Sequence, residues 1–224
     1  MTIRSLTYFS VAAAIAVAGC ATDSSGTDGA LSQTATRPDC APNDTACQID
    51  GLNAPLALGA RLPLDINVTA RGVASPLLTL EPARADILAV ESGHLIGKSE
   101  GWSSVMMMSE DGLVMDFITL NVKNPDRVEL YRLSDDGGTE ASPLPDKIQL
   151  APGDDFELSV KAFFKDTRLL GELDSEWTIE GSGVTILDAG RPASRRLRIK
   201  DPGTVKLKVK ATSFEKELTL EVLP

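Results

Sequence analysis

The chain has 224 residues, a hydrophobic share of 42% and a formal net charge of −10. Such an acidic chain is a poor general ligand for nucleic acid, so we expect no nucleic-acid partner. The sequence contains no G-x-S-x-G, H-E-x-x-H or phosphate-loop motif. We therefore expect a protein that is not an enzyme, with no cofactor and no catalytic residue.

The N-terminus has the pattern of a secretory signal. Arg4 precedes an apolar run from Leu6 to Ala18, and the segment ends in Val17-Ala18-Gly19-Cys20. The run is shorter than the roughly 20 residues that cross a bilayer as a helix, so we do not expect a permanent membrane helix.

Val-Ala-Gly-Cys resembles the lipobox of bacterial lipoproteins. The resemblance implies that residues 1–19 are a lipoprotein signal peptide and that Cys20 becomes the first residue, carrying diacylglyceryl and N-acyl chains. Two or more chains make anchoring stable. Ala21 stands where an Asp would suggest inner-membrane retention in enterobacterial relatives. We therefore expect a lipid-anchored protein of the bacterial cell envelope, with the outer membrane favoured; an ordinary secretory signal is the alternative.

Residues 20–51 are predicted to form a disordered tether. The stretch from Thr22 to Asp50 is rich in Thr, Ser, Asp, Gly, Ala and Pro, and it cannot bury enough apolar surface to fold. Cys40 and Cys47 are the remaining cysteines, and in an oxidising compartment we expect them to form one disulfide across a small loop. Their spacing is not C-x-x-C, which argues against a redox role.

From Leu56 onward, apolar and polar residues alternate with period two, which is typical of strands with one buried face. Examples are Leu62-Leu64-Ile66-Val68, Phe156-Leu158-Val160-Ala162 and Val205-Leu207-Val209-Ala211. Turn signals such as Asp111-Gly112 and Pro202-Gly203 separate the strands. The pattern predicts an all-β fold of antiparallel β-sandwiches.

Two weakly similar halves follow the tether. The first, residues 52–124, ends in ITLNV, and the second, residues 125–224, ends in LTLEV. Each is long enough for one small core. Asn124-Pro125-Asp126 marks the join, because proline interrupts strand pairing.

The stretch ADILAVESGHLIGKSEGWSSVMMMSEDGLVMDFITLNV resembles the second half of a bacterial Ig-like group 2 domain. LAPGDDFELSVKAFF, SEWTIEGSGVTILDAG and DPGTVKLKVKA resemble the same superfamily, with Trp177 in a core position of the third strand. The resemblance implies two Ig-like sandwiches in tandem, of a kind common in surface proteins and adhesins, and it implies no reaction. Trp102 stands where relatives have a small residue.

Three consecutive methionines lie in the hairpin SSVMMMSEDGLVMDF. A two-residue turn at Asp111-Gly112 would place Met106 opposite Phe117 and Met108 opposite Met115. One face, with Val105, Met107, Ile118, Leu120 and Val122, would be core. The other face is also apolar and is our candidate partner-binding surface, made of Trp102, Met106, Met108, Met115 and Phe117.

Four explanations of this second apolar face are open. The second domain or the tether covers it, a one-residue register slip makes it core, it docks a partner, or its thioethers bind Cu(I).

Arg191, Arg195, Arg196 and Arg198 form a positive cluster in an acidic chain, without an obvious acidic strand beside them. The functional interpretation is binding of an anionic partner such as lipopolysaccharide phosphate or an acidic protein. The alternative is a solvated strand face. Paired carboxylates such as Asp154 and Asp155 lack EF-hand spacing, so no metal ligand is assigned.

The sequence favours a non-catalytic envelope lipoprotein whose Ig-like domains bind another envelope or surface protein, or a glycan. A structural spacer that holds a partner near the outer membrane is the alternative, and copper binding by the methionines is a remote one. No sequence pattern identifies the partner or an oligomeric state.

Overall fold

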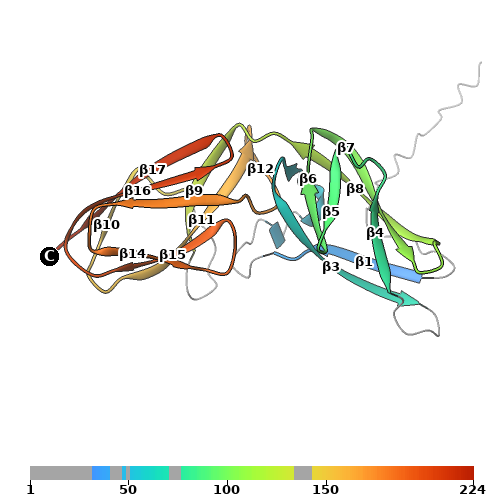
Figure 1. The fold of residues 1–224 in the computed structure, drawn as a ribbon, viewed down its shortest axis with the longest axis horizontal. Coiled ribbons are helices and arrows are strands. Elements are labelled where there is room, and N and C mark those ends of the chain that lie inside the picture. Colours follow the sequence, from blue (N-terminus) through green and yellow to red (C-terminus); the bar gives the residue numbers. More distant parts are fainter. Residues whose placement is uncertain (1–31, 41–46, 49–50, 71–76, 134–142) are drawn as a thin grey trace, which may run out of the picture.

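The structure is a computed structural model that describes residues 32–40, 47–48, 51–70, 77–133 and 143–224. These residues form two β-sandwiches placed end to end, with the C-terminus at the far end of the second sandwich (Figure 1). No helix in the described ranges is long and apolar enough to cross a membrane.

The first sandwich consists of two four-stranded sheets. One sheet has the order β1 (Ser32–Pro38), β3 (Arg61–Ala70), β6 (His94–Gly97) and β5 (Leu88–Glu91). The other has the order β2 (Leu56–Ala57), β8 (Val114–Lys123), β7 (Gly101–Ser109) and β4 (Leu78–Pro82). A 3₁₀ turn, η1 (Gly51–Asn53), precedes β2.

The second sandwich repeats this arrangement. In one sheet β11 (Asp155–Phe164) pairs with β9 (Arg127–Leu133), β12 (Thr167–Arg168) and β15 (Ser194–Ile199), which in turn pairs with β14 (Val184–Asp188). The other sheet has the order β10 (Lys147–Leu150), β17 (Phe214–Val222), β16 (Gly203–Ala211) and β13 (Ser175–Glu180).

Both sandwiches have a short strand that pairs in parallel with the last strand of the sandwich. β2 pairs with β8 in the first, and β10 pairs with β17 in the second. The remaining strands divide between two mainly antiparallel sheets in the order found in immunoglobulin-like sandwiches. The predicted all-β fold of tandem antiparallel sandwiches is therefore confirmed.

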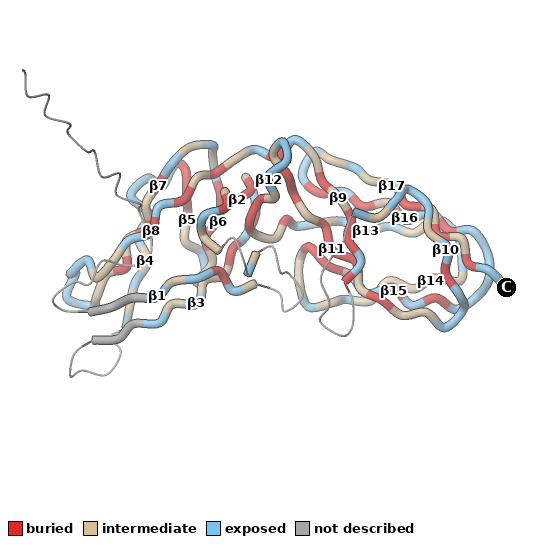
Figure 2. Tube along the Cα trace, turned by 180° about the vertical axis from the view of Figure 1, so that it is seen from behind, coloured by how far each residue is buried: buried red, intermediate tan, exposed pale blue. Residues whose placement is uncertain are grey.

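The alternation of side chains places one face of each strand in a core. Phe156, Leu158, Val160 and Ala162 on β11 are buried, as are Val205 and the apolar residues that follow it on β16. Figure 2 shows buried segments along the inner sides of the sheets in both sandwiches and also between the sandwiches. Burial of apolar area at about 25 cal/mol per Å² is the main stabilising contribution of such faces.

β1 differs from the sequence expectation, which includes residues 32–38 in the tether. These residues pair with β3 from Ser32↔Ala70 to Pro38↔Leu64. β1 lies at the edge of its sheet, where a polar strand is held by main-chain hydrogen bonds and a proline is tolerated. Composition alone did not reveal this strand, because it contributes few apolar side chains.

The disulfide between Cys40 and Cys47 is present, with their Cα atoms 5.8 Å apart. It follows β1 and lies where the two sandwiches meet, since both cysteines line a small cavity together with Leu170 and Arg191. The bridge therefore lies beside the second sandwich.

The two sandwiches are joined by main-chain pairing as well as by the chain itself. Ala57 N donates to Leu170 O over 3.0 Å and Leu170 N donates to Pro55 O over 2.7 Å. Arg61 and Glu172 exchange two further main-chain hydrogen bonds, of 3.0 and 2.8 Å. Main-chain hydrogen bonds thus run from residues 55–61 of the first sandwich to residues 170–172 of the second.

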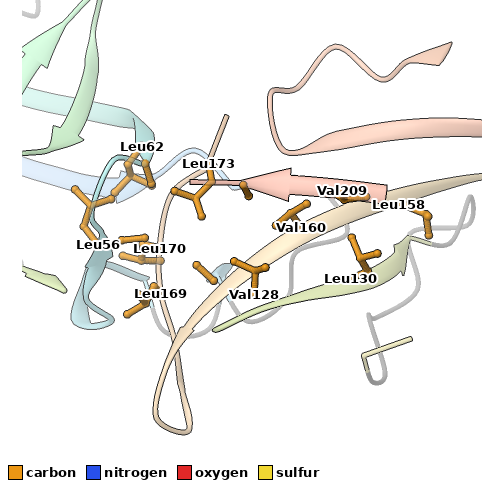
Figure 3. Close-up of a cluster of buried hydrophobic side chains, with 14 of the residues drawn as sticks. Leu56, Leu62, Val128, Leu130, Leu158, Val160, Leu169, Leu170, Leu173 and Val209 are labelled. Carbon is orange, nitrogen blue, oxygen red and sulfur yellow. The ribbon is translucent and has the colours of Figure 1, made fainter. Parts of the chain in front are cut away.

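Buried side chains fill the same junction. Leu56 and Leu62 from the first sandwich lie next to Leu169, Leu170 and Leu173 from the second (Figure 3), and all five belong to one buried apolar cluster. This cluster continues into the cores on either side. The two sandwiches therefore share one core at their contact.

Candidate binding face

The β7–β8 hairpin has the predicted register near its middle and a different one near its turn. Val105 lies opposite Ile118 and Met106 lies opposite Phe117. A β-bulge between Met107 and Met108 then shifts the pairing, so that Met108 lies opposite Val114. The predicted pairing of Met108 with Met115 is therefore wrong.

The turn explains the shift. Four residues, 110–113, connect the strands instead of two. Gly112 N donates to Ser109 O, and Leu113 N donates to the Ser109 hydroxyl over 3.2 Å. Gly112 has φ +76°, a conformation that glycine adopts readily. The longer loop leaves one extra residue on β8, which the bulge absorbs.

The inner face of the hairpin is core. Val105, Met107, Ile118, Leu120 and Val122 are at most 1% exposed. Met106 and Met108, which alternate with these residues, are only partly buried. The proposed register slip that would make the second face core is thus excluded.

The outer face carries exposed aromatic rings. Trp102 is 63% exposed and Phe117 is 57% exposed, so the second sandwich does not cover them. Met106, Met108 and Met115 are partly buried. We call these five residues the methionine face. The alternative that the tether covers the methionine face concerns the residues before 32, which lie outside the described residues.

The methionine face is not continuous from end to end. Ser104 and Thr119 lie opposite each other between Trp102 and Met106, and their hydroxyl oxygens are 2.9 Å apart. Trp102 is therefore set apart near the junction, whereas Met106, Phe117 and Met108 adjoin the turn. The bulge shifts Met115 out of register with its expected neighbour Met108.

Three further apolar side chains are exposed where the hairpin turns. Leu113 is 55% and Val114 54% exposed, and Leu77, beside the start of β4, is 74% exposed. Leu78 pairs with Ser109, which places Leu77 at the same end of the sandwich. We call Leu77, Leu113 and Val114 the apolar tip. Sequence reasoning missed it because Leu77 is far in sequence from Leu113 and Val114.

Three of the four arginines in the cluster are paired with carboxylates. Arg196 and Arg198 on β15 both donate to Asp155 on β11, over 2.5 and 3.1 Å, and Arg191 forms an ion pair with Glu172. Arg195 donates to the main-chain oxygen of Ser194 over 2.6 Å. An acidic neighbour is thus present, contrary to the sequence expectation, because β11 pairs with β15.

These contacts lower the pKa of the acid. The hydrogen bond from Arg196 is the main reason that the pKa of Asp155 lies below its ordinary value, and the hydrogen bond from Arg198 acts in the same direction. A carboxylate held ionised between two guanidinium groups offsets one of their two positive charges. The geometry favours an ion-paired strand face over an anion-binding site.

The described residues contain no group of three or more His, Cys, Asp or Glu side chains arranged to hold a metal ion. The cavity between the sandwiches has a volume of about 30 Å³. Ligand sites usually measure about 300–1,000 Å³, so this cavity has room for little more than one water molecule. Cys20, the predicted lipidation site, lies outside the described residues.

No family model and no curated protein matches the sequence. Among solved structures, domains 5–6 of the S-layer protein SbsC are similar over 76% of this chain and 92% of that chain, with 16% identity and a TM-score of 0.34. The Escherichia coli adhesin FdeC is similar over 85% and 63%, with 11% identity and a TM-score of 0.32. Invasin, a bacterial integrin-binding protein, is similar over 85% and 40%, with 11% identity and a TM-score of 0.30.

Proposed function

We propose that this protein is a non-catalytic, lipid-anchored envelope protein that binds another envelope or surface protein, or a glycan, through the methionine face. The observation that carries the proposal is the exposure of Trp102 and Phe117 on a strand pair whose other face is already core. A sandwich needs one buried face per sheet for stability, so exposed rings on the second face are available for contact.

The composition of the face suits a protein partner. Exposed aromatic rings supply large contact areas, and methionine side chains adapt to irregular surfaces. The polar Ser104–Thr119 pair between Trp102 and Met106 adds a hydrogen-bonding position inside the apolar area. Aromatic anchors surrounded by adaptable and polar groups are typical of binding hot spots.

Anchoring depends on Cys20. In this proposal the acylated cysteine holds the chain in the envelope, with the outer membrane favoured. Mass spectrometry of the N-terminal peptide tests the anchor, and acyl chains on Cys20 are the expected result. Cys20→Ser should release the protein from the membrane fraction, and a variant that stayed in that fraction would contradict the anchor.

Photo-crosslinking in native envelopes tests the binding role. A photoreactive amino acid at Met106 should give one discrete adduct, and Phe117→Ser should weaken it, since Phe117 is its cross-strand neighbour. The same amino acid at Thr178, an exposed position of β13 in the second sandwich, is the matched control. Equal adduct patterns at the two positions would contradict a specific face.

A spacer is the second candidate function, and the junction favours it. Main-chain hydrogen bonds and one continuous apolar cluster fix the two sandwiches to each other. A spacer needs such a connection, because a flexible join would not set a distance. Absence of any specific adduct at Met106, with the junction intact, would favour the spacer over the binder.

A further inference from the structure

The apolar tip lies at one extremity of the molecule. β3 begins at Arg61, which pairs with Glu172 of the second sandwich, and it ends at Ala70, away from that contact. β7 runs in the same sense towards Ser109 and the turn that holds Leu113 and Val114. The C-terminus lies at the opposite extremity, beyond the second sandwich (Figure 1).

The described chain also begins at the tip end. Ser32 pairs with Ala70, so the segment that precedes Ser32 enters the fold at the end farthest from the second sandwich. An extended chain spans about 3.3–3.6 Å per residue, so the stretch from Cys20 to Ser32 reaches at most about 40 Å. A membrane that holds Cys20 therefore lies within this distance of the start of β1.

We propose that the apolar tip rests in the surface of the bilayer that holds the Cys20 acyl chains. This inference depends on the lipid anchor in the proposed function. Leu77, Leu113 and Val114 are all more than half exposed at the end where the anchored segment enters. Apolar side chains beside a lipid anchor add a second membrane contact to that of the acyl chains.

The charges around the tip limit the depth of this contact. Glu110 and Asp111 lie in the same turn and are exposed, and Asp116 follows on β8. Carboxylates are not transferred into hydrocarbon without large cost, so they stay at the headgroup level while the apolar side chains reach the acyl boundary. The tip therefore fits a bilayer surface of uncharged lipids better than an anionic one.

The experiment uses the acylated full-length chain, purified from bacterial envelopes. Leu113→Cys is labelled with an environment-sensitive fluorophore and reconstituted into vesicles of phosphatidylcholine and phosphatidylethanolamine, with or without bromine on the acyl chains. Leu223→Cys, at the other extremity, carries the same label as a control. We expect brominated lipid to quench the label at 113 by about twofold or more and to leave the label at 223 unchanged.

Adding Leu77→Asn to the labelled Leu113→Cys protein should reduce the quenching, because it removes one apolar contact from an exposed position. A label at 113 that brominated lipid does not quench, in protein that floats with the vesicles, would overturn the membrane contact and leave the anchor intact. Shielding from water without lipid quenching would indicate a second copy or another protein on the tip, which also overturns it. If the protein purified from envelopes carries no acyl chains and does not float with the vesicles, both the anchor and the tip contact are overturned.

Discussion

Leu56 and Leu170 form a parallel β-bridge between the two sandwiches. Leu56 is fully buried and Leu170 is 4% exposed, and hydrogen bonds from Ala57 N and Leu170 N flank the bridge. Because main-chain pairing and apolar burial coincide here, bending at the junction would break hydrogen bonds and expose the cluster. The two sandwiches are thus held as one rigid unit.

Gly171 is expected to be essential for this junction. Its φ is +88°, and a Cβ atom would lie 2.8 Å from Ala60 Cβ and 2.9 Å from Leu56 Cδ1. Gly171→Ala should lower the free energy of unfolding by about 2–4 kcal/mol, because backbone strain and overpacking add. Chemical denaturation measures the loss.

Gly190→Ala is the matched control for Gly171→Ala. Gly190 has φ +76°, but a Cβ atom there would meet nothing within 4 Å. We expect this variant to lose only about 1 kcal/mol, from backbone strain alone. Equal losses at the two positions would show that close packing at the junction contributes nothing.

Adjacent methionines on β7 should respond very differently to truncation. Met107 is fully buried, whereas Met106 is on the partly exposed face. Met107→Ala should cost about 2–5 kcal/mol through the cavity it leaves, and Met106→Ala less than about 1 kcal/mol. Urea unfolding of the two variants compares them directly, and a larger loss at Met106 would contradict the described faces.

The Asp155 ion pairs predict a dependence of stability on pH. Arg196 and Arg198 lower the pKa of Asp155 in the folded protein. Its stabilising contribution is therefore present above the unfolded pKa of about 3.9 and is lost as the pH falls through the lower, folded pKa. Asp155→Asn should destabilise the protein at neutral pH, and the difference from wild type should narrow in acid.

Unfolding in urea at neutral pH and at the lowest pH that preserves the fold measures this difference. Asp166→Asn, in an exposed turn, serves as the control. If the difference in free energy of unfolding between wild type and Asp155→Asn stayed constant over this pH range, the ionised pairs would not contribute to stability.

Strands and their buried faces could be predicted from the sequence because burial repeats every second residue. The alternation identified the core side of β11 and β16, and the turn near Gly112 gave the correct pairing of Val105 with Ile118. The same reasoning failed beyond the bulge, since loop length depends on hydrogen bonds such as that from Leu113 N to Ser109 Oγ. Local sequence does not distinguish a two-residue turn from a four-residue one.

Contacts between distant segments could not be predicted in this way. The pairing of Leu56 with Leu170 and of Arg198 with Asp155 depends on which strands become neighbours. Period-two alternation assigns a face to each residue, but it does not name the strand beside it. β1 was missed for the same reason, because its partner β3, rather than its own composition, makes it a strand.

A distance measurement across the junction tests the central claim, that the two sandwiches form one rigid unit. Spin labels at Glu81→Cys on β4 and Thr178→Cys on β13 occupy exposed positions of the first and second sandwich. Pulsed electron spin resonance should give a single narrow distance distribution, which broadens in Gly171→Ala. A broad distribution in the otherwise unaltered protein would contradict the rigid junction.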